Sequence, residues 1–445
     1  MAMDHRILTH RWDVEDAHTL PVAEAHGAYV GLKKSLGMQP AEVTEVVKAS
    51  GLRGRGGAGF PTGVKWSFVP GPDKRGDKPV YLVCNADESE PGTFKDRYLM
   101  WKDPHMFIEG CIIAAYAIGA HHAYIYLRGE FAYIQERVDQ AIAEARAKGY
   151  IGKNVMGSGW DCEVYTHLGA GAYICGEETA LLSSLEGQRG QPKLKPPFPA
   201  VEGAWRCPTI VNNVETMAAV PWIIENGADA YRQFGTEKAP GTKLFSCSGN
   251  IKKPGVYEIP LGTPMTTLLN EYCGGLYEGR TLQAVIPGGS SVPVMTPDEV
   301  EKATMDYESI NEVSGSYLGS GGFIVMDDTV DLPEALTNLL RFYAHESCGQ
   351  CTPCREGVGW MHKVLERVSA REATDEDLAL LKDLADNIFG RTICFFGPSA
   401  AMPVQSFLKK FPDVFFERVH RGGDVDYSDL GAVDPAAPSA PAPAK

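Results

Sequence analysis

The first half of the chain alternates between two hydrophobic periods. Short β-rich runs predict three strands, at residues 80–84, 123–127 and 161–167. An apolar run at 108–120 and an amphipathic run at 134–148 predict helices between them. Residues before about Ser50 read as a helical lead-in, with valines at helical spacing. This alternation predicts a layered, Rossmann-like α/β domain, which we place at residues 1–240.

From Thr242 the pattern changes to strand, turn, strand, helix and strand. The turn is expected at residues 253–255, the helix at 265–272 and the last strand at 282–286. This ββαβ order is compatible with a small α+β domain of the β-grasp (ubiquitin-like, SLBB-like) type, placed at residues 241–325. We find no catalytic constellation in it.

The last part of the chain carries four apolar stripes at helical spacing. They are Leu336, Leu339, Leu340 and Tyr343; Val358, Met361, Leu365 and Val368; Leu378, Leu381, Leu384 and Ile388; and Val404, Phe407, Leu408 and Phe411. They predict a four-helix bundle at residues 326–430. The alanine- and proline-rich tail at 431–445 is expected to be disordered.

Composition narrows the class of protein. With 445 residues, 44% of them hydrophobic and 22% charged, the chain has an ordinary globular composition. Its net charge of -15 argues against nucleic acid or an anionic membrane as partner. The run at 108–120 contains Glu109 and is short for a bilayer, so a buried helix is expected. Eleven cysteines without a secretory signal at the start favour a reducing compartment.

A glycine-rich stretch between residues 50 and 66 is the first candidate site. Gly54, Gly56 and Gly59 allow close approach of the backbone to an anion, and Arg55 and Lys65 add positive charge. Their Gly-x-Gly-x-x-Gly spacing follows a helix and precedes a strand, the reverse of the usual dinucleotide order. We interpret the stretch as a nucleotide-cradling loop; a plain glycine-rich turn is the alternative.

Two further turns carry carboxylates. Asp87, Glu88 and Glu90 follow the strand at 80–84, at the end where α/β sheets bind ligands. Glu177 and Glu178 follow a second glycine-rich strand-to-helix turn. They could bind ribose or ribityl hydroxyls, or merely solvate a turn and complement a helix dipole. Two such turns in one domain favour a shared ligand pocket.

Prolines stiffen residues 193–199 around Phe198, which could stack on an adenine or pack in its own loop. Residues 212–216, Asn-Asn-Val-Glu-Thr, are expected to begin the helix that closes the first domain.

Three cysteines, Cys348, Cys351 and Cys354, have the spacing that places three thiolates around one iron–sulfur cluster. Cys394 is the candidate for the fourth ligand, because an up-down bundle returns the loop between its third and fourth helices to the same end. Structural zinc usually takes separated pairs of ligands, so a three-plus-one set favours [4Fe-4S] over zinc. The other cysteines are interpreted as core residues.

The chain closely resembles the flavoprotein (F-type) subunit family of respiratory NADH:quinone oxidoreductase, complex I. The resemblance is carried by four motifs in the same order along the chain: the glycine-rich loop, the acids of residues 85–92, the second glycine-rich turn and the cysteine set. The resemblance covers residues 30–420 or so. It implies an NADH-oxidising enzyme in which a hydride passes from NADH to FMN, and single electrons pass to a [4Fe-4S] cluster and on to quinone.

The resemblance also implies roles for individual residues. The FMN contacts would be Gly54, Arg55, Gly56, Lys65, Asn85, Asp87, Glu88, Tyr173, Gly176, Glu177, Asn212, Asn213 and Thr216. The NADH site would comprise Phe60, Phe68 and Phe198 for the adenine, Glu90 and Lys195 near its ribose, and Glu178, also placed as the catalytic residue, near the nicotinamide. Cys348, Cys351, Cys354 and Cys394 would hold the cluster.

The implied partners are a small [2Fe-2S] subunit (E-type) and a large iron–sulfur subunit (G-type), on the cytoplasmic side of a bacterial inner membrane, with no nucleic acid. Two alternatives stay open. One is a diaphorase subunit of an NAD-linked hydrogenase or formate dehydrogenase, many of which carry extra cysteine pairs that this chain lacks. The other is a non-enzymatic, zinc-stapled nucleotide-binding scaffold.

Overall fold

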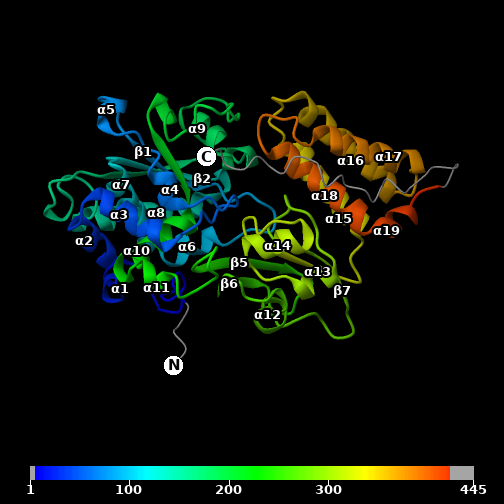
Figure 1. The fold of residues 1–445 in the computed structure, drawn as a ribbon, viewed down its shortest axis with the longest axis horizontal. Coiled ribbons are helices and arrows are strands. Elements are labelled where there is room, and N and C mark those ends of the chain that lie inside the picture. Colours follow the sequence, from blue (N-terminus) through cyan, green and yellow to red (C-terminus); the bar gives the residue numbers. More distant parts are fainter. Residues whose placement is uncertain (1–5, 421–445) are drawn as a thin grey trace.

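The computed structural model describes residues 6–420 of the chain, so the predicted tail at 431–445 lies outside the described residues. Three bodies are visible in Figure 1. The first half forms an α/β body at the left, the segment from β5 to β8 a smaller body below, and the last helices a bundle at the upper right. These are the three parts that the hydrophobic pattern predicts.

A four-stranded parallel sheet organises the first body, in the order β3-β2-β1-β4. Its strands are β1 (Tyr81–Ala86), β2 (His122–Leu127), β3 (Glu163–Leu168) and β4 (Thr209–Asn213). Leu82, Cys84 and Ile125 point into a core shared with α7 and α10, which cover one face. Because all four strands are parallel, their carboxyl ends form one edge.

Helices of this body precede the sheet, connect its strands or follow β4, its last strand. They are α1 (Leu20–Ala25), α2 (Val30–Leu36), α3 (Pro40–Ser50), α4 (Thr62–Trp66), α5 (Pro72–Arg75), α6 (Asp96–Lys102), α7 (Pro104–Ile118), α8 (Ala132–Lys148), α9 (Glu178–Leu185), α10 (Val214–Asn226) and α11 (Ala228–Tyr231). Four short 3-10 turns lie at Gly129–Phe131, Val155–Gly157, Tyr173–Gly176 and Ala204–Arg206.

Strand β4 was not predicted, and this corrects the expectation for residues 212–216. Asn212 and Asn213 end a strand rather than begin a helix, and α10 starts at Val214 with Asn213 as its N-cap. The β-branched run Thr209-Ile210-Val211 is short, and buried strands of this length have no visible alternation. The correction places both asparagines at the carboxyl edge of the sheet.

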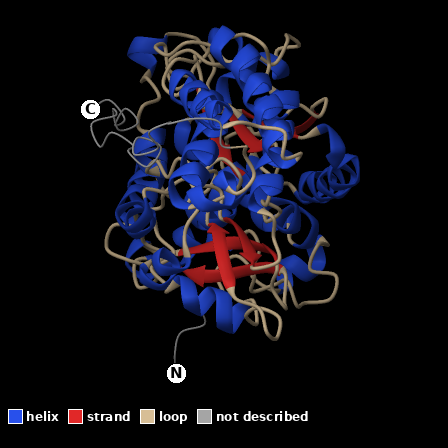
Figure 2. Ribbon diagram, turned by 90° about the vertical axis from the view of Figure 1, so that its right-hand side faces the viewer, coloured by secondary structure: helices blue, strands red, loops and turns tan. Residues whose placement is uncertain are grey.

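The second body has the predicted ββαβ order and one further strand. Its sheet runs β6-β5-β8-β7, from β5 (Thr242–Gly249), β6 (Gly255–Pro260), β7 (Leu282–Ile286) and β8 (Gly322–Asp327). The predicted helix is α12 (Met265–Thr267) followed by a π-turn at Leu268–Tyr272, and α13 (Pro297–Lys302) and α14 (Tyr307–Ser314) precede β8. Figure 2 shows this sheet as the lower group of strands, apart from the parallel sheet above.

Four long helices form the bundle, as predicted. They are α15 (Leu332–Glu346), α16 (Thr352–Ser369), α17 (Asp375–Ile388) and α18 (Phe396–Lys410), with the short α19 (Pro412–Phe416) after them. The core residues of the bundle are continuous with Val83 and Val211 of the parallel sheet and with Ile286 of the second body. The bundle is therefore packed against both other bodies.

No helix within residues 6–420 is long and apolar enough to cross a membrane.

Candidate functional site

The glycine-rich loop lies between α3 and α4 and is held by the second body. Tyr307 on α14 donates a hydrogen bond from its hydroxyl to the Gly54 carbonyl, at 3.0 Å. A Cβ on Gly59 would lie 2.5 Å from the Tyr307 ring, and Gly59 has a φ of 65°. Only glycine fits there without displacing the ring. The loop is thus locked between two domains.

A cavity of about 260 Å³ lies at the carboxyl edge of the parallel sheet. Its walls come from all three bodies. The first contributes Arg55, Gly56, Asn85, Asp87, Glu88, Ser89, Glu90, Thr93, Lys95, Asp96, Tyr173, Ile174, Gly176, Glu177 and Asn213; the second Ser291 and Ser320; and the bundle Cys394, Phe395, Phe396 and Ser399. The predicted glycine loop, acidic turn and second glycine turn therefore share one cavity.

Asn85 and Asp87 line this cavity from the end of β1. The Asn85 side chain donates to the Gly176 carbonyl at 2.8 Å, which joins the acidic turn to the second glycine turn. Burial raises the pKa of the Asp87 carboxyl to about 7, although the Ser89 hydroxyl and Arg128 oppose that rise. Asp87 can therefore be either a donor or an acceptor toward a ligand near neutral pH.

Most of the predicted flavin contacts have side chains engaged within the protein, and four of these hold α6 or the glycine loop in place. The Glu88 carboxylate accepts from the backbone amide of Asp96 at 2.6 Å and pairs with Arg97 at 2.8 Å, so it caps α6. The buried Arg55 guanidinium reaches Tyr231 and the Thr242 carbonyl, each at 3.0 Å.

The other two of these four are Asn212 and Thr216. Asn212 accepts from the Trp66 indole at 2.9 Å, and the Thr216 hydroxyl accepts from the Arg55 backbone amide at 2.8 Å. Neither lines the cavity, and both support the glycine loop from behind. Gly54 likewise lies outside the cavity wall.

Glu90 and Tyr173 join the three bodies at one side of the cavity. The buried Glu90 carboxylate accepts from the Tyr173 hydroxyl at 2.5 Å and from the Ser291 amide at 2.8 Å. The Tyr173 amide donates to Glu346, at the end of α15, at 3.0 Å. Burial raises the pKa of Glu90, against these hydrogen bonds.

Glu177 and Glu178 have different surroundings at the start of α9. Glu177 is the N-cap and accepts from the backbone amides of Thr179 and Ala180, at 2.8 and 2.9 Å. Glu178 pairs with Lys65 at 3.3 Å and with Lys195. Burial would raise the pKa of Glu178, but the two ammonium groups outweigh it and lower the pKa to about 2. Glu178 is therefore an anion at neutral pH, outside the cavity wall itself.

Two of the three predicted stacking aromatics are exposed. The Phe60 and Phe68 rings lie 5.9 Å apart, centroid to centroid, and Phe68 is 50% exposed. Phe198 is 51% exposed on the proline-stiffened segment, close in sequence to Lys195. Exposed aromatic rings beside the Lys65–Glu178–Lys195 group can receive a planar base.

The four predicted cluster cysteines lie at the ends of α16 and α18, near enough for several of their thiols to influence one another's pKa. Cys348 and Cys351 precede α16, Cys354 lies in its first turn, and Cys394 precedes α18. The amide of Ile393, next to Cys394, donates to the Cys351 sulfur at 3.3 Å. Burial raises the pKa of the Cys354 thiol to about 11 and of the Cys394 thiol to about 12, and neighbouring thiols add to both shifts.

Among residues 6–420, no three His, Cys, Asp or Glu side chains are grouped so as to hold a metal ion.

Several cavity residues were missed from the sequence. Lys95 and Asp96 line the wall from the start of α6, Ser291 and Ser320 from the second body, and Phe395 from the segment after Cys394. Lys95 is fully buried, which lysines rarely are unless they are paired, and a lysine only a few residues after the Asp87–Glu90 turn was the available signal. The two serines carry no sequence signal, since only the domain packing brings them to the cavity.

The wall chemistry fits FMN. Asn85, Asn213 and Lys95 offer donors, and Asp87 and Glu90 offer acceptors, as ring carbonyls, ribityl hydroxyls and a phosphate require. A Cβ on Gly56 would lie 3.1 Å from the Asn213 Cβ, so the glycine lets the loop lie close to the end of β4. Soft thiolates in the set around Cys351 and Cys394 fit an iron–sulfur cluster.

Three family models match the chain. They are a Nuo51 FMN-binding domain at residues 47–222, an SLBB domain at 243–311 and an NADH-ubiquinone oxidoreductase-F iron-sulfur binding region at 334–418. These matches and the observed sheets and bundle confirm the predicted fold class. An FMN-binding domain and an iron–sulfur region together also confirm the predicted cofactors.

Curated relatives match over nearly the full length. One of the F-type subunits of NADH-quinone oxidoreductase from Rhizobium meliloti (strain 1021), the one numbered 2, is 51% identical over 93% of this chain and 97% of its own. The F-type subunit of NADH-quinone oxidoreductase from Mycobacterium tuberculosis (strain ATCC 25618 / H37Rv) is 50% identical over 94% of each chain.

A solved structure is also similar. The crystal structure of an NAD+-reducing [NiFe]-hydrogenase in the H2-reduced state superposes with a TM-score of 0.80 at 37% identity, covering 88% of this chain and 65% of the hydrogenase chain. High identity to the curated relatives over both whole chains decides the family. The chain belongs to the family of F-type NADH-quinone oxidoreductase subunits.

Proposed function

We propose that this chain is the NADH-oxidising, electron-input subunit of a proton-translocating NADH:quinone oxidoreductase of the complex I type. The observation that carries the proposal is the shared cavity: Cys394 of the cysteine set lines the same cavity as Gly56 and Asn85. When bound, FMN accepts a hydride from NADH and releases electrons singly to an iron–sulfur cluster. A flavin in this cavity would lie next to a cluster held by Cys394, so electrons could pass from one to the other without an intermediate side chain.

The FMN site is assigned to the wall of the cavity. Gly56, Asn85, Asp87, Tyr173, Gly176, Glu177 and Asn213 contact the cofactor directly, and Gly54, Arg55, Lys65, Glu88, Asn212 and Thr216 hold the glycine loop and α6 in place. This division follows from the cavity wall: the first group lines it, and the second lies outside it or, for Arg55 and Glu88, has its charged group bonded to Tyr231 and Thr242 or to the start of α6. Asp87, which lacks a lysine or arginine ion pair, is the wall residue best placed to bond a hydroxyl.

NADH is assigned to the outer side of the same cavity. Phe60, Phe68 and Phe198 stack on the adenine, Glu90 and Lys195 lie near its ribose, and Glu178 lies near the nicotinamide end. Lys195 contacts both Glu177 and Glu178, so it connects the proposed NADH side with a cavity-wall residue. No general acid or base is required, so Glu178 acts by charge and position.

The cluster is assigned to Cys348, Cys351, Cys354 and Cys394. The loop that carries Cys348 is held from the first body, because Arg189 donates to the Cys348 carbonyl at 3.2 Å. We keep the first domain boundary near residue 240. The second, predicted after residue 325, is moved to follow Asp327, because β8 continues to that residue.

Electrons leave through partners. We assign an E-type [2Fe-2S] subunit and a G-type iron–sulfur subunit as the partners, and the cytoplasmic side of a bacterial inner membrane as the location, reached through other subunits. The second candidate function is the diaphorase subunit of an NAD-reducing hydrogenase. The fold similarity at a TM-score of 0.80 favours that candidate, and the near-complete mutual coverage with the F-type relatives favours the first.

The purified chain tests the proposal. Alone, or with a small iron–sulfur partner, it should oxidise NADH with ferricyanide and show flavin bands with a broad sulfide shoulder. It should not pump protons into sealed vesicles when given NADH and a quinone, since no helix within residues 6–420 can span them. A colourless, zinc-containing protein without NADH oxidation would contradict the proposal, and pumping by this chain alone would overturn the input-subunit assignment.

Nucleotide choice tests the placement of Glu90. A carboxylate near the ribose accepts bonds from a 2′-hydroxyl and repels a 2′-phosphate, so Glu90→Gln should narrow the preference for NADH over NADPH by about tenfold. The measurement is the ratio of the two kcat/KM values. Glu163→Gln, which changes a partly exposed acid on β3, is the control. An unchanged ratio would leave Glu90 as a wall residue that only holds Tyr173 and Ser291.

A further inference from the structure

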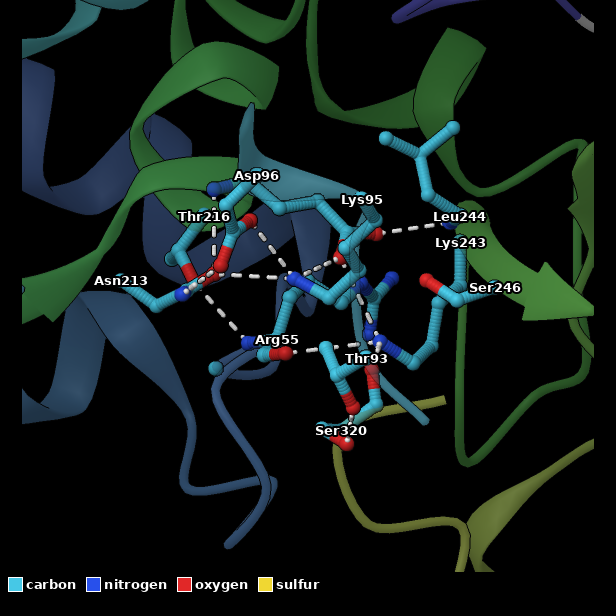
Figure 3. A network of polar contacts seen from close by, with 12 residues as sticks. Arg55, Thr93, Lys95, Asp96, Asn213, Thr216, Lys243, Leu244, Ser246 and Ser320 are labelled. Carbon is cyan, nitrogen blue, oxygen red and sulfur yellow. Dashed lines mark hydrogen bonds and ion pairs between the residues drawn. The ribbon is translucent and has the colours of Figure 1, made fainter. Parts of the chain in front are cut away.

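A buried cluster of charges lies behind the cavity, where the first and second bodies meet (Figure 3). Glu215, at the start of α10, is fully buried. Its carboxylate lies 2.7 Å from the Lys95 ammonium and 3.3 Å from the Lys243 ammonium. Lys95 lines the cavity, whereas Lys243 belongs to β5 of the second body and does not.

Lys243 also contacts the backbone on both sides of the cavity. Its ammonium donates to the Arg55 carbonyl of the glycine loop at 3.4 Å and to the Ser320 carbonyl at 3.0 Å. Ser320 lines the cavity, and its hydroxyl bonds that of Thr93. A single side chain thus holds the glycine loop, the Ser320 turn and the carboxylate that fixes Lys95.

We propose that Lys243 is a positioning residue for the flavin: through Glu215 and the Arg55 carbonyl, the second domain sets the place of the Lys95 ammonium and of the glycine loop in the FMN cavity. This inference rests on the assignment of the cavity to FMN made above. Lys243 does not touch the cofactor. It acts on the groups that do.

The alternative is that Lys243 only holds two domains together. The surroundings of Lys243 favour a role in positioning the cavity groups as well. Three cations are gathered near one buried carboxylate, Glu215: they are Lys95, which has Asp96 beside it, Lys243 and Arg55. Acidic side chains outnumber basic ones on the cavity wall, where Asp87, Glu88, Glu90, Asp96 and Glu177 face only Arg55 and Lys95 among the described residues. A phosphorylated ligand adds further negative charge on binding, so the cations gathered at Glu215 are the groups that can offset it.

The protonation of Lys243 should make the affinity for FMN depend on pH. Burial, with the nearby Lys95 and Arg55 cations, lowers the pKa of Lys243 to about 7, although Glu215 and Asp96 attract its proton. An anionic phosphate bound nearby favours the protonated form, so binding takes up a proton. FMN affinity should therefore fall as pH rises through about 7, and riboflavin, which lacks the phosphate, should show little of this loss.

The test uses the full-length chain freed of flavin, with FMN and riboflavin affinities measured by quenching of flavin fluorescence. Lys243→Met should weaken FMN binding about tenfold or more, because it removes a charge-assisted contact to the groups that line the cavity. Its affinity should also lose most of the pH dependence between pH 6.5 and 8.5. The fluorescence signal reports binding independently of NADH oxidation.

Lys410→Met is the matched control. Lys410 of the bundle is also a largely buried lysine that joins two bodies, since it pairs with Glu299 at 2.8 Å and bonds the Ser314 carbonyl. It lies outside the cavity wall, so its FMN affinity should stay within about twofold of the wild type. Equal weakening by both variants would reduce Lys243 to a domain contact and overturn the inference, as would an unchanged affinity in Lys243→Met.

Two more measurements separate a failure of the Lys243 inference from a failure of the FMN assignment or of folding. Asn85→Ala removes a wall residue: if it too leaves FMN affinity unchanged, the cavity assignment itself fails, whereas weakening by Asn85→Ala alone rejects only the role of Lys243. If Lys243→Met does not fold, Lys243→Arg decides, because a guanidinium keeps its charge across pH 6.5 to 8.5. An FMN-to-riboflavin affinity ratio that falls over this range in the wild type but stays flat in Lys243→Arg supports the inference. An equal fall in both chains, as the titration of Asp87 on the cavity wall would give, or a constant wild-type ratio overturns it.

Discussion

Cys394→Ser should leave the chain with less than about a tenth of its iron, because a serine hydroxyl replaces one of the thiolates that an iron–sulfur cluster requires. The same loss is expected for Cys348, Cys351 and Cys354. Iron per chain and the sulfide shoulder in the visible spectrum are the measurements. Electron transfer from NADH to an added iron–sulfur partner should disappear with the cluster.

Cys207→Ser is the control for this prediction. Cys207 is also partly exposed, but its sulfur donates to the Trp205 carbonyl and it is not one of the predicted ligands, so the iron content of Cys207→Ser should match the wild type. Retention of full iron in Cys394→Ser would remove Cys394 from the ligand set. The fourth ligand would then have to be sought elsewhere.

Glu215→Gln should lower the free energy of unfolding by about 3–5 kcal/mol, since it removes the carboxylate from a buried cluster and leaves cations uncompensated. Lys95, Lys243 and the Leu244 amide all contact that carboxylate within 3.3 Å. The pairing lowers the pKa of Glu215 despite its burial, so the group is charged in the folded chain. Urea unfolding of the flavin-free protein, followed by circular dichroism, measures the loss.

Glu163→Gln again serves as comparison. Glu163 pairs with Arg146 at 3.0 Å, but both side chains are substantially exposed, and such pairs contribute at most about 1 kcal/mol. If Glu215→Gln were no more damaging than Glu163→Gln, the buried cluster would not be an ion network. The Lys243 inference would then lose its connection to Lys95.

Much of the architecture follows from local pattern. The parallel strands β1, β2 and β3 and the stripes of the bundle are visible because each side chain's burial repeats with the period of its element. The cysteine set, which stays a prediction for the cluster ligands, is visible for a different reason: the spacing of its first three members can be read directly from the sequence. The acids after β1 were found because the carboxyl end of a strand is where a sheet binds ligands.

What escaped prediction depends on tertiary packing. Strands β4 and β8 were missed, one because it is short and fully buried, the other because two helices separate it from the rest of its sheet. The sequence also did not separate residues that line the cavity from residues that support its wall. Nothing in the sequence tells that, of two neighbouring acids on the cavity wall, Glu88 bonds the start of α6 whereas the Asp87 carboxyl bonds the Ser89 hydroxyl.

The cavity wall has one more consequence, for biogenesis. Gly56, Ser320 and Cys394 come from three separately organised bodies, and the cavity between them exists only when all three have docked. If this cavity holds the flavin, as proposed, flavin loading follows the docking of the sheet, the small domain and the bundle. A nascent or truncated chain without the last long helix of the bundle lacks Phe396 and Ser399 and has an incomplete cavity wall, so we expect it not to retain flavin.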